Sequence, residues 1–301
     1  MKIVAPASSL KDIEEYNKLG VDEIYIGLRN EKNDWKIINK RSEKNANFKN
    51  LEEIRKIKTD AEISFVINNS FFDDSRLKIV KKQIIDTKNY VNNYIISDPS
   101  LIKIVKKYAP NKNIILSVIG ANFNSESIKF FTKKGIKKII LPRHLTMTEF
   151  KKIVEKNKQT EFEVLIMNQY CRNVDGFCSR CHIPENGIYQ MTCDIPFNSK
   201  LIKLNDNISN DKLNLAQKNI ANISKFNRIC GLCFIKDFQK IGINHLKLVG
   251  RNHNTKWKVD DVKMVKEAIE NLETNKTKFI KKCKTIFKNR KGRDCNNNCY
   301  Y

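Results

Sequence analysis

Short apolar, β-branched runs alternate along the chain with segments in which apolar residues recur at helical spacing. Eight runs have the length and composition of strands: residues 2–6, 23–28, 62–68, 94–97, 114–119, 138–142, 162–166 and 245–250. Helical segments such as 9–20, 100–109 and 149–157 lie between them, several beginning at Ser or Thr. The alternation predicts an α/β fold, a (β/α)8 TIM-like barrel, with a doubly wound open sheet as the alternative.

The spacing changes after the seventh run. The next helical segment, 234–242, begins more than sixty residues later, whereas such loops usually hold about 2 to 6 residues. The loop has few apolar side chains to offset the entropy of ordering it, so we expect a metal centre to hold it. We divide the chain into a barrel, residues 1–255, containing a Cys-rich insertion, 169–233, and a C-terminal helix with a Cys-rich tail, 256–301.

The chain is strongly basic, with 57 Lys and Arg against 33 Asp and Glu and a formal net charge of +24. Its hydrophobic fraction of 41% is sufficient for a sizeable core. The basic excess favours a polyanionic partner such as RNA, because cationic side chains release counterions when they meet phosphates. Only 11 of the basic residues are Arg, so a Lys-rich genome composition is the alternative explanation.

No segment of the sequence has the features of a membrane or secretory element. Residues 1–20 lack the apolar core of a secretory signal, and no run reaches the roughly 18 apolar residues of a membrane span. We therefore expect a cytoplasmic protein without a membrane partner. In a reducing compartment, nine cysteines indicate metal ligands or redox groups rather than disulfides.

The cysteines begin only after the seventh strand-like run. Six of them fall in the long loop: Cys171, Cys178, Cys181, Cys193, Cys230 and Cys233. The two CxxC pairs among them permit a zinc site, and four dispersed thiolates equally permit a [4Fe-4S] cluster. Spacing leaves both metals open, with structurally inert thiols as a third explanation.

Several stretches resemble the U32 family of collagenase-like peptidases, over nearly all of residues 1–255. They include "KIVAPASSLKDIEEYNKLGVDEIYIGL", "NANFKNLEEI", "FVINNSFFDD", "IISDPSLI", "IILPRHLTMTEF" and "GINHLKLVGR". The resemblance supports the barrel and implies substrate-binding positions at or near strand ends: Asn68, Asp98, Arg143, Lys247 and Arg251. The cationic ones suit an anionic substrate or an RNA phosphate, with salt bridges inside the protein as the alternative.

The resemblance also implies that four cysteines hold a [4Fe-4S] cluster: Cys171, Cys178, Cys193 and Cys230. Zinc remains the alternative metal. Family members with this pattern are oxygen-independent hydroxylases that act in ubiquinone synthesis or on a base of tRNA or 23S rRNA. The chain departs from the family at Met167, Val249 and His144, where a His, a Glu and an acidic residue are usual. Acid and base roles of those positions do not carry over.

The last nineteen residues contain three further cysteines in a basic tail. We predict a second centre, iron–sulfur or zinc, ligated by Cys233, Cys283, Cys295 and Cys299, with Cys181 as a substitute ligand. The helical segment 259–274 would lead the tail back to the barrel mouth, where Tyr300 and Tyr301 would pack it.

Histidines offer weaker candidates. His182 lies inside the cysteine loop and suits an alternative ligand or proton donor, although a plain loop histidine explains it as well. His144 and His253 follow the sixth and eighth strand-like runs, where they would face the barrel mouth or the solvent.

Three functions are consistent with these features. The first is an iron–sulfur enzyme that hydroxylates an RNA base or a small aromatic or isoprenoid substrate without oxygen. The second is a peptidase, although the sequence has no HExxH, no G-x-S-x-G and no recognisable Cys/His pair. The third is a non-catalytic subunit that pairs with a second U32 protein.

Overall fold

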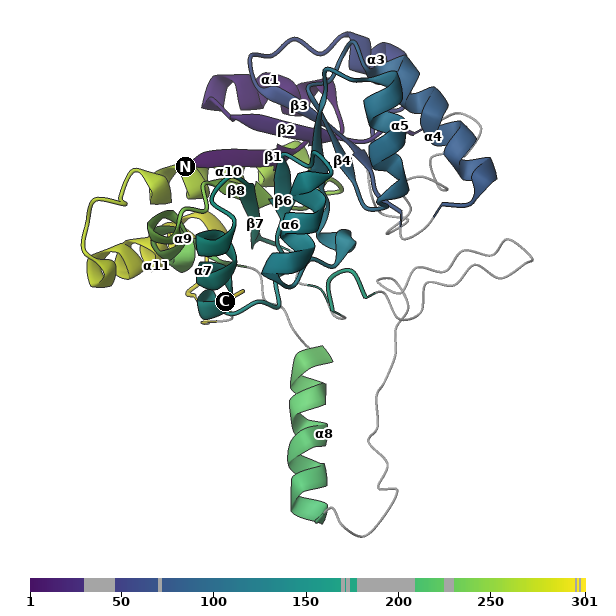
Figure 1. Cartoon of the computed structure of the whole chain (residues 1–301). Coiled ribbons are helices and arrows are strands. Elements are labelled where there is room, and N and C mark those ends of the chain that lie inside the picture. Colours follow the sequence, from purple (N-terminus) through teal and green to yellow (C-terminus); the bar gives the residue numbers. More distant parts are fainter. Residues whose placement is uncertain are drawn as a thin grey trace.

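Eight parallel strands close into a barrel within the part of the chain that the structure describes (Figure 1). The structure is a computed structural model that describes residues 1–29, 47–69, 72–168, 171, 174–177, 209–224, 230–295, 297 and 299–301. The strands are β1 (Lys2–Pro6), β2 (Glu23–Ile26), β3 (Glu62–Ile67), β4 (Asn93–Ile96), β5 (Asn113–Leu116), β6 (Lys138–Ile140), β7 (Glu161–Met167) and β8 (His245–Leu248). Each pairs with its sequence neighbours, and β8 closes the barrel on β1, so the predicted TIM-like barrel is confirmed.

Helices surround the barrel in the order that the sequence pattern predicts. They are α1 (Leu10–Leu19), α3 (Leu51–Arg55), α4 (Asp74–Thr87), α5 (Ser100–Tyr108), α6 (Ser125–Lys133), α7 (Met147–Lys156), α9 (Ile235–Ile241) and α10 (Thr255–Ile269). Two more helices lie outside the alternation: α8 (Asn210–Ser224) in the long connection after β7, and α11 (Lys276–Lys291) after α10. Short 3-10 turns, η1 (Val118–Gly120) and η2 (Leu232–Phe234), follow β5 and precede α9.

Local sequence signals set the helix boundaries. Ser9 and Asn50 accept hydrogen bonds from backbone N–H groups at the starts of α1 and α3, and Thr146 forms a capping box with Glu149 at the start of α7. Helix α1 ends at Gly20, whose φ of 63° is left-handed and therefore suits glycine. Ser117 caps η1, which explains why β5 ends at Leu116 rather than at the expected residue 119.

Apolar residues fill the half of the barrel interior that lies toward the carboxyl ends of the strands. They form a cluster distinct from the larger core between strands and helices: Val4, Tyr25, Val66, Ile95, Ile115, Ile140, Leu165 and Tyr300. All but Tyr300 come from strands, as expected for a barrel whose inward-pointing side chains stack in layers.

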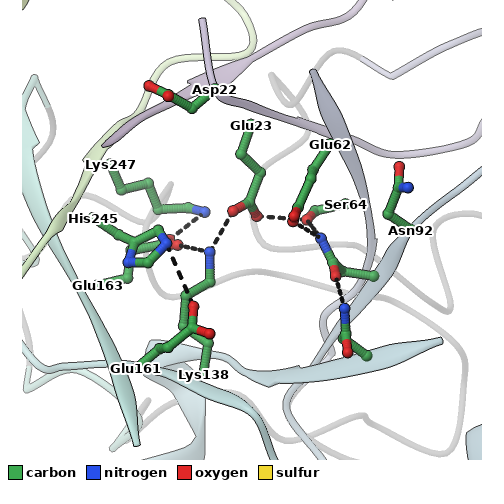
Figure 2. A network of polar contacts seen from close by, with 12 residues as sticks. Asp22, Glu23, Glu62, Ser64, Asn92, Lys138, Glu161, Glu163, His245 and Lys247 are labelled. Atoms are coloured by element: carbon green, nitrogen blue, oxygen red, sulfur yellow. Dashed lines mark hydrogen bonds and ion pairs between the residues drawn. The ribbon is translucent and has the colours of Figure 1, made fainter. Parts of the chain in front are cut away.

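Charged residues fill the opposite end of the interior (Figure 2). Lys138 is ion-paired with Glu23 and, at 2.9 Å, with Glu163, which in turn accepts a hydrogen bond of 2.7 Å from Lys247. These four side chains are no more than 9% exposed. Glu23 and Lys138 are the first residues of β2 and β6, so the network lies toward the amino ends of the strands.

The pKa values in this network follow from burial and pairing. Burial alone would raise the pKa of Glu163, but Lys138 and Lys247 outweigh it and hold the pKa at about 2. Burial would lower the pKa of Lys138, yet Glu163 and Glu23 raise it above the usual value. Because the pKa of Glu163 is depressed, its contribution to stability is present above the usual carboxyl pKa and is lost as pH falls toward 2.

Replacing Lys138 by Met should therefore destabilise the barrel strongly. Two buried carboxylates would lose their shared cation, and such losses typically cost about 3–5 kcal/mol. Urea unfolding followed by circular dichroism measures the change. Lys137→Met is the matched control, because Lys137 pairs with Glu161 across 3.7 Å at a half-exposed position and should change the unfolding free energy by less than about 1 kcal/mol. Equal losses in the two variants would contradict a structural role for the buried network.

Candidate active site at the carboxyl end of the barrel

Arg143 and Asp175 form an enclosed ion pair just after β6. The guanidinium donates to Asp175 Oδ2 from Nε at 2.9 Å and to Oδ1 from Nη2 at 2.6 Å, and the Arg143 backbone N–H donates to Oδ2 at 2.9 Å. The two side chains are 10% and 1% exposed. Burial opposes both charges, but Arg143 holds the pKa of Asp175 well below its usual range. The pair thus fixes Arg143 in a bidentate geometry.

Asp175 belongs to a short piece of the long loop that is anchored to the barrel. Val174 and Phe177 pair in a tight turn, in which Gly176 has a φ of 85°. A side chain on Gly176 would collide with Ala121, so glycine is required for this close approach. The ring of Phe177 stacks on Phe123, with centroids 5.7 Å apart. The loop after β7 is therefore attached to the connections that follow β5 and β6.

The C-terminal segment covers the barrel mouth, at the carboxyl ends of the strands. Tyr300 is 1% exposed and joins the apolar cluster inside the barrel. Its backbone N–H donates to the Cys230 carbonyl at 3.0 Å, and the Tyr301 hydroxyl donates to the Leu165 carbonyl at 2.7 Å. Burial raises the pKa of Tyr300 despite a hydrogen bond with Arg143. The two tyrosines do pack the tail, and they pack it into the end of the barrel.

Cys230 lies at the same mouth. It forms a backbone bridge with Met167, the last residue of β7, and a second bridge with Cys299 of the tail. Its side chain is buried, and burial raises the pKa of its thiol to about 12. Cys171, four residues after β7, is half-buried. Neither cysteine forms a disulfide, so their thiols fit the soft donor set that an iron–sulfur cluster or zinc requires.

Cys233 and the three tail cysteines lie near Cys230. Cys233 and Cys283 are hydrogen-bonded to each other, which lowers the pKa of Cys233 to about 7. Cys295 and Cys299 are near enough to Cys230 to raise the pKa of its thiol slightly, after burial has done so. Among the described residues, no three His, Cys, Asp or Glu side chains gather as a metal site. The second centre stays a prediction.

The predicted cations of β8 occupy two different environments. Lys247 belongs to the buried network, and its ammonium lies 3.9 Å from the centroid of the Tyr25 ring. Arg251 lies beyond the end of β8, is 8% exposed and donates to Asn47 Oδ1 at 2.6 Å. Burial lowers the pKa of both groups. Gly27 leaves the space for Asn47 and Arg251, because a Cβ there would collide with both.

The other predicted residues lie around the mouth or outside the described part of the chain. Asn68 follows β3 and is half-buried, and Asp98 follows β4 and accepts a hydrogen bond from Ser100 N at 2.8 Å. His144 accepts a hydrogen bond of 3.3 Å from Asp175 N. His253 contacts Trp257, with ring centroids 5.4 Å apart. Four predicted residues lie outside the described residues: Cys178, Cys181, His182 and Cys193.

The match to a family model covers residues 8–301, and the model is that of peptidase family U32. The chain belongs to this family. The match extends beyond the barrel strands to the tail that closes the mouth. The resemblance inferred from the strand and loop motifs is thereby confirmed.

Curated proteins that are similar in sequence to this chain include several named tRNA hydroxylation protein. The protein P of Haemophilus influenzae is 28% identical over 186 residues, which cover 59% of this U32 chain and 38% of the relative. The Escherichia coli protein P is 27% identical with the same coverage, and Bacillus subtilis protein P1 is 25% identical, covering 59% and 41%. The chain thus spans about two-fifths of the length of these curated relatives.

A solved structure of low sequence identity has a similar fold. Proteus mirabilis N-acetylneuraminate lyase has a TM-score of 0.50 and 9% identity, with coverage of 93% of this chain and 78% of the lyase. A U32 peptidase structure has a TM-score of 0.46 and 9% identity, covering 83% of this chain and 93% of the peptidase.

Across the described residues, no helix is long and apolar enough to span a membrane.

The Arg143–Asp175 pair should show strong energetic coupling. Asp175→Asn or Arg143→Met alone would leave a buried charge without its partner, at a cost of about 3–5 kcal/mol each. The double variant should lose much less than the sum, because neither charge remains. Urea unfolding of the four proteins gives the coupling energy.

The exposed pair of Lys151 and Glu155 on α7 serves as the control for this cycle. Its two groups are 3.8 Å apart and more than half exposed, so its coupling should stay below about 0.5 kcal/mol. Additive losses at Arg143 and Asp175 would show that the pair does not anchor the loop.

Proposed function

We propose that this U32 protein modifies RNA by hydroxylating a base, with tRNA as the first candidate substrate. The observation that carries the proposal is the family match over residues 8–301 together with the relatives named tRNA hydroxylation protein. The net charge of +24 supports a polyanionic substrate. Because the chain spans only part of those relatives, their activity is a hypothesis here. The proposed location is the cytoplasm, where RNA substrates are present.

The proposed cofactor is a [4Fe-4S] cluster on Cys171, Cys178, Cys193 and Cys230, with zinc as the alternative metal. Support comes from the soft donor set at the end of β7, where Cys171 and Cys230 carry thiols outside any disulfide. Bound there, the cluster would supply electron transfer to the reaction. It would lie at the barrel mouth, where active sites of this fold are built.

The described side chains at the mouth would position and enclose the substrate. Arg143 is fixed by Asp175 beside the tail, so its orientation is set before any substrate binds. Arg251 is held by Asn47, and its guanidinium carbon lies 5.9 Å from the centroid of the Tyr25 ring. Tyr300 fills the centre of the mouth and excludes water from the barrel interior. A pairing with a second U32 subunit stays a prediction.

Protein purified without oxygen should contain about four irons per chain for one cluster. Cys171→Ala, Cys178→Ala, Cys193→Ala and Cys230→Ala should each remove that iron. Cys283→Ala should leave it in place, since Cys283 is buried against Leu232 and belongs to the other predicted set. Iron, sulfide and zinc analysis with visible spectra measures the result. Stoichiometric zinc in a colourless protein would contradict the iron assignment.

Hydroxylation should appear as one added oxygen atom on an RNA nucleoside. The gene would be expressed in a bacterial host whose own tRNA hydroxylation protein has been deleted, and tRNA and rRNA nucleosides would be measured by mass spectrometry. Cys230→Ala is the matched inactive control. If the iron-loaded protein adds no oxygen to either RNA, the proposal is wrong. Peptide cleavage by the wild type would then favour the peptidase alternative. If an Arg143→Met variant cleaved peptides equally well, the peptidase site would not include Arg143.

A further inference from the structure

Helix α11 differs in composition from the helices of the barrel. Its sixteen residues, KTKFIKKCKTIFKNRK, contain eight Lys or Arg and no Asp or Glu. Helices α4 and α10 also carry many lysines, but each includes acidic residues in the same stretch, and α5, which has no Asp or Glu, is only nine residues long with three lysines. The Lys-rich composition of the whole chain therefore does not by itself explain a long helix with one sign of charge.

The basic side chains of α11 gather on its outer face. Phe279, Cys283, Ile286 and Phe287 are buried and define the inner face. Four exposed lysines lie opposite them: Lys278, Lys281, Lys284 and Lys288. Within the described part of the chain, the first three form no ion pair with a carboxylate, whereas Lys288 pairs with Asp294 at 3.0 Å. The outer face is thus a solvated row of cations.

Helix α11 lies near the carboxyl end of the barrel, close to the candidate active site. At its end, Lys291 pairs with Asp261 Oδ1 at 2.6 Å. Asp261 Oδ2 accepts a hydrogen bond of 2.7 Å from Asn168 Nδ2, and Asn168 is the residue after β7. In its middle, the Cys283 thiol contacts the carbonyl of Leu232 at 3.7 Å. Leu232 lies two residues after Cys230. At its start, Lys276 pairs with Asp237 in the first turn of α9. Figure 1 shows α11 beside α9, away from α4 and α5.

An exposed aromatic residue continues this surface. Trp257, in the first turn of α10, is 53% exposed, and the Lys291 ammonium lies 5.2 Å from its ring centroid. Basic side chains beside an exposed indole are suited to nucleic acid, because phosphates meet the cations while an unpaired base stacks on the ring.

We propose that the outer face of α11, together with Trp257, binds the backbone and one unpaired base of the RNA whose modified base lies against the barrel mouth. The inference rests on the proposed function, since it assigns the RNA-binding surface of the same site. The row of cations supplies affinity without reading sequence. Its position beside Asn168 and Leu232 directs bound RNA toward the cysteines.

Charge reversal on this face should weaken RNA binding selectively. The variant Lys278→Glu/Lys281→Glu/Lys284→Glu should raise the Kd for unmodified tRNA at least about tenfold, and the slope of log Kd against log salt should fall by about 2–3. The control, Lys78→Glu/Lys82→Glu/Lys103→Glu, makes the same charge change at exposed positions of α4 and α5 on the other side of the barrel. Its Kd should stay within about threefold of the wild type. Filter binding at several salt concentrations, with thermal unfolding to verify folding, gives both readings.

Substitutions of Trp257 test the stacking part. Trp257→Ala should raise the Kd about five- to tenfold without changing the salt slope, and Trp257→Phe should restore most of the affinity. Equal weakening by the α4/α5 control and the α11 variant would overturn the inference while leaving the proposed function intact, because RNA would still bind. Wild-type protein that binds neither tRNA nor rRNA would overturn both. An α11 variant that loses tRNA binding but keeps its iron supports the inference.

Discussion

The structure depends on one lysine ammonium that two buried carboxylates share. Lys138 lies between Glu23 and Glu163, and Lys247 neutralises the second oxygen of Glu163 (Figure 2). Charges in this interior are costly unless each finds a partner, so the strands that carry them must keep their register. Strands β2, β6, β7 and β8 are thereby tied across the barrel as well as along its circumference. The buried network thus stabilises the amino end of the barrel, and the candidate active site lies at the carboxyl end.

A different principle organises the carboxyl end. Segments that are far apart in the sequence are brought together by single anchors: Asp175 on Arg143, Asn47 on Arg251 and Tyr300 on Cys230. Asp175 and Asn47 join loops to residues that follow strands, and Tyr300 joins the tail to the end of the long loop, where Cys230 bridges to the last residue of β7. The same principle places the basic helix α11 beside the mouth, through Lys291 and Asp261. The proposed RNA-binding face of α11 and the thiol of Cys230 can then be neighbours without sharing residues.

The sequence predicted the fold far better than the contacts of the site. Strands are marked by local runs of Val and Ile, and Ser or Thr caps mark several helix starts, so each element carries its own signal. Arg143 and Arg251 were found through family motifs, but their partners Asp175 and Asn47 were not. The pair Asp175 and Gly176 does signal a turn, yet nothing local to it says which cation it meets. Tyr300 was expected to pack the tail, and only the closed barrel shows that the apolar interior receives it.

The contacts of the tail also set an order of events along the folding pathway. Tyr301 bonds to Leu165 across 136 positions of sequence, and the receiving carbonyl of Cys230 is in place only once the end of the long loop lies against β7. The tail contacts therefore depend on earlier docking of the loop, and their own sequence separation adds a cost in loop-closure entropy. The tail can therefore dock on the barrel mouth only after the end of the long loop has docked against β7.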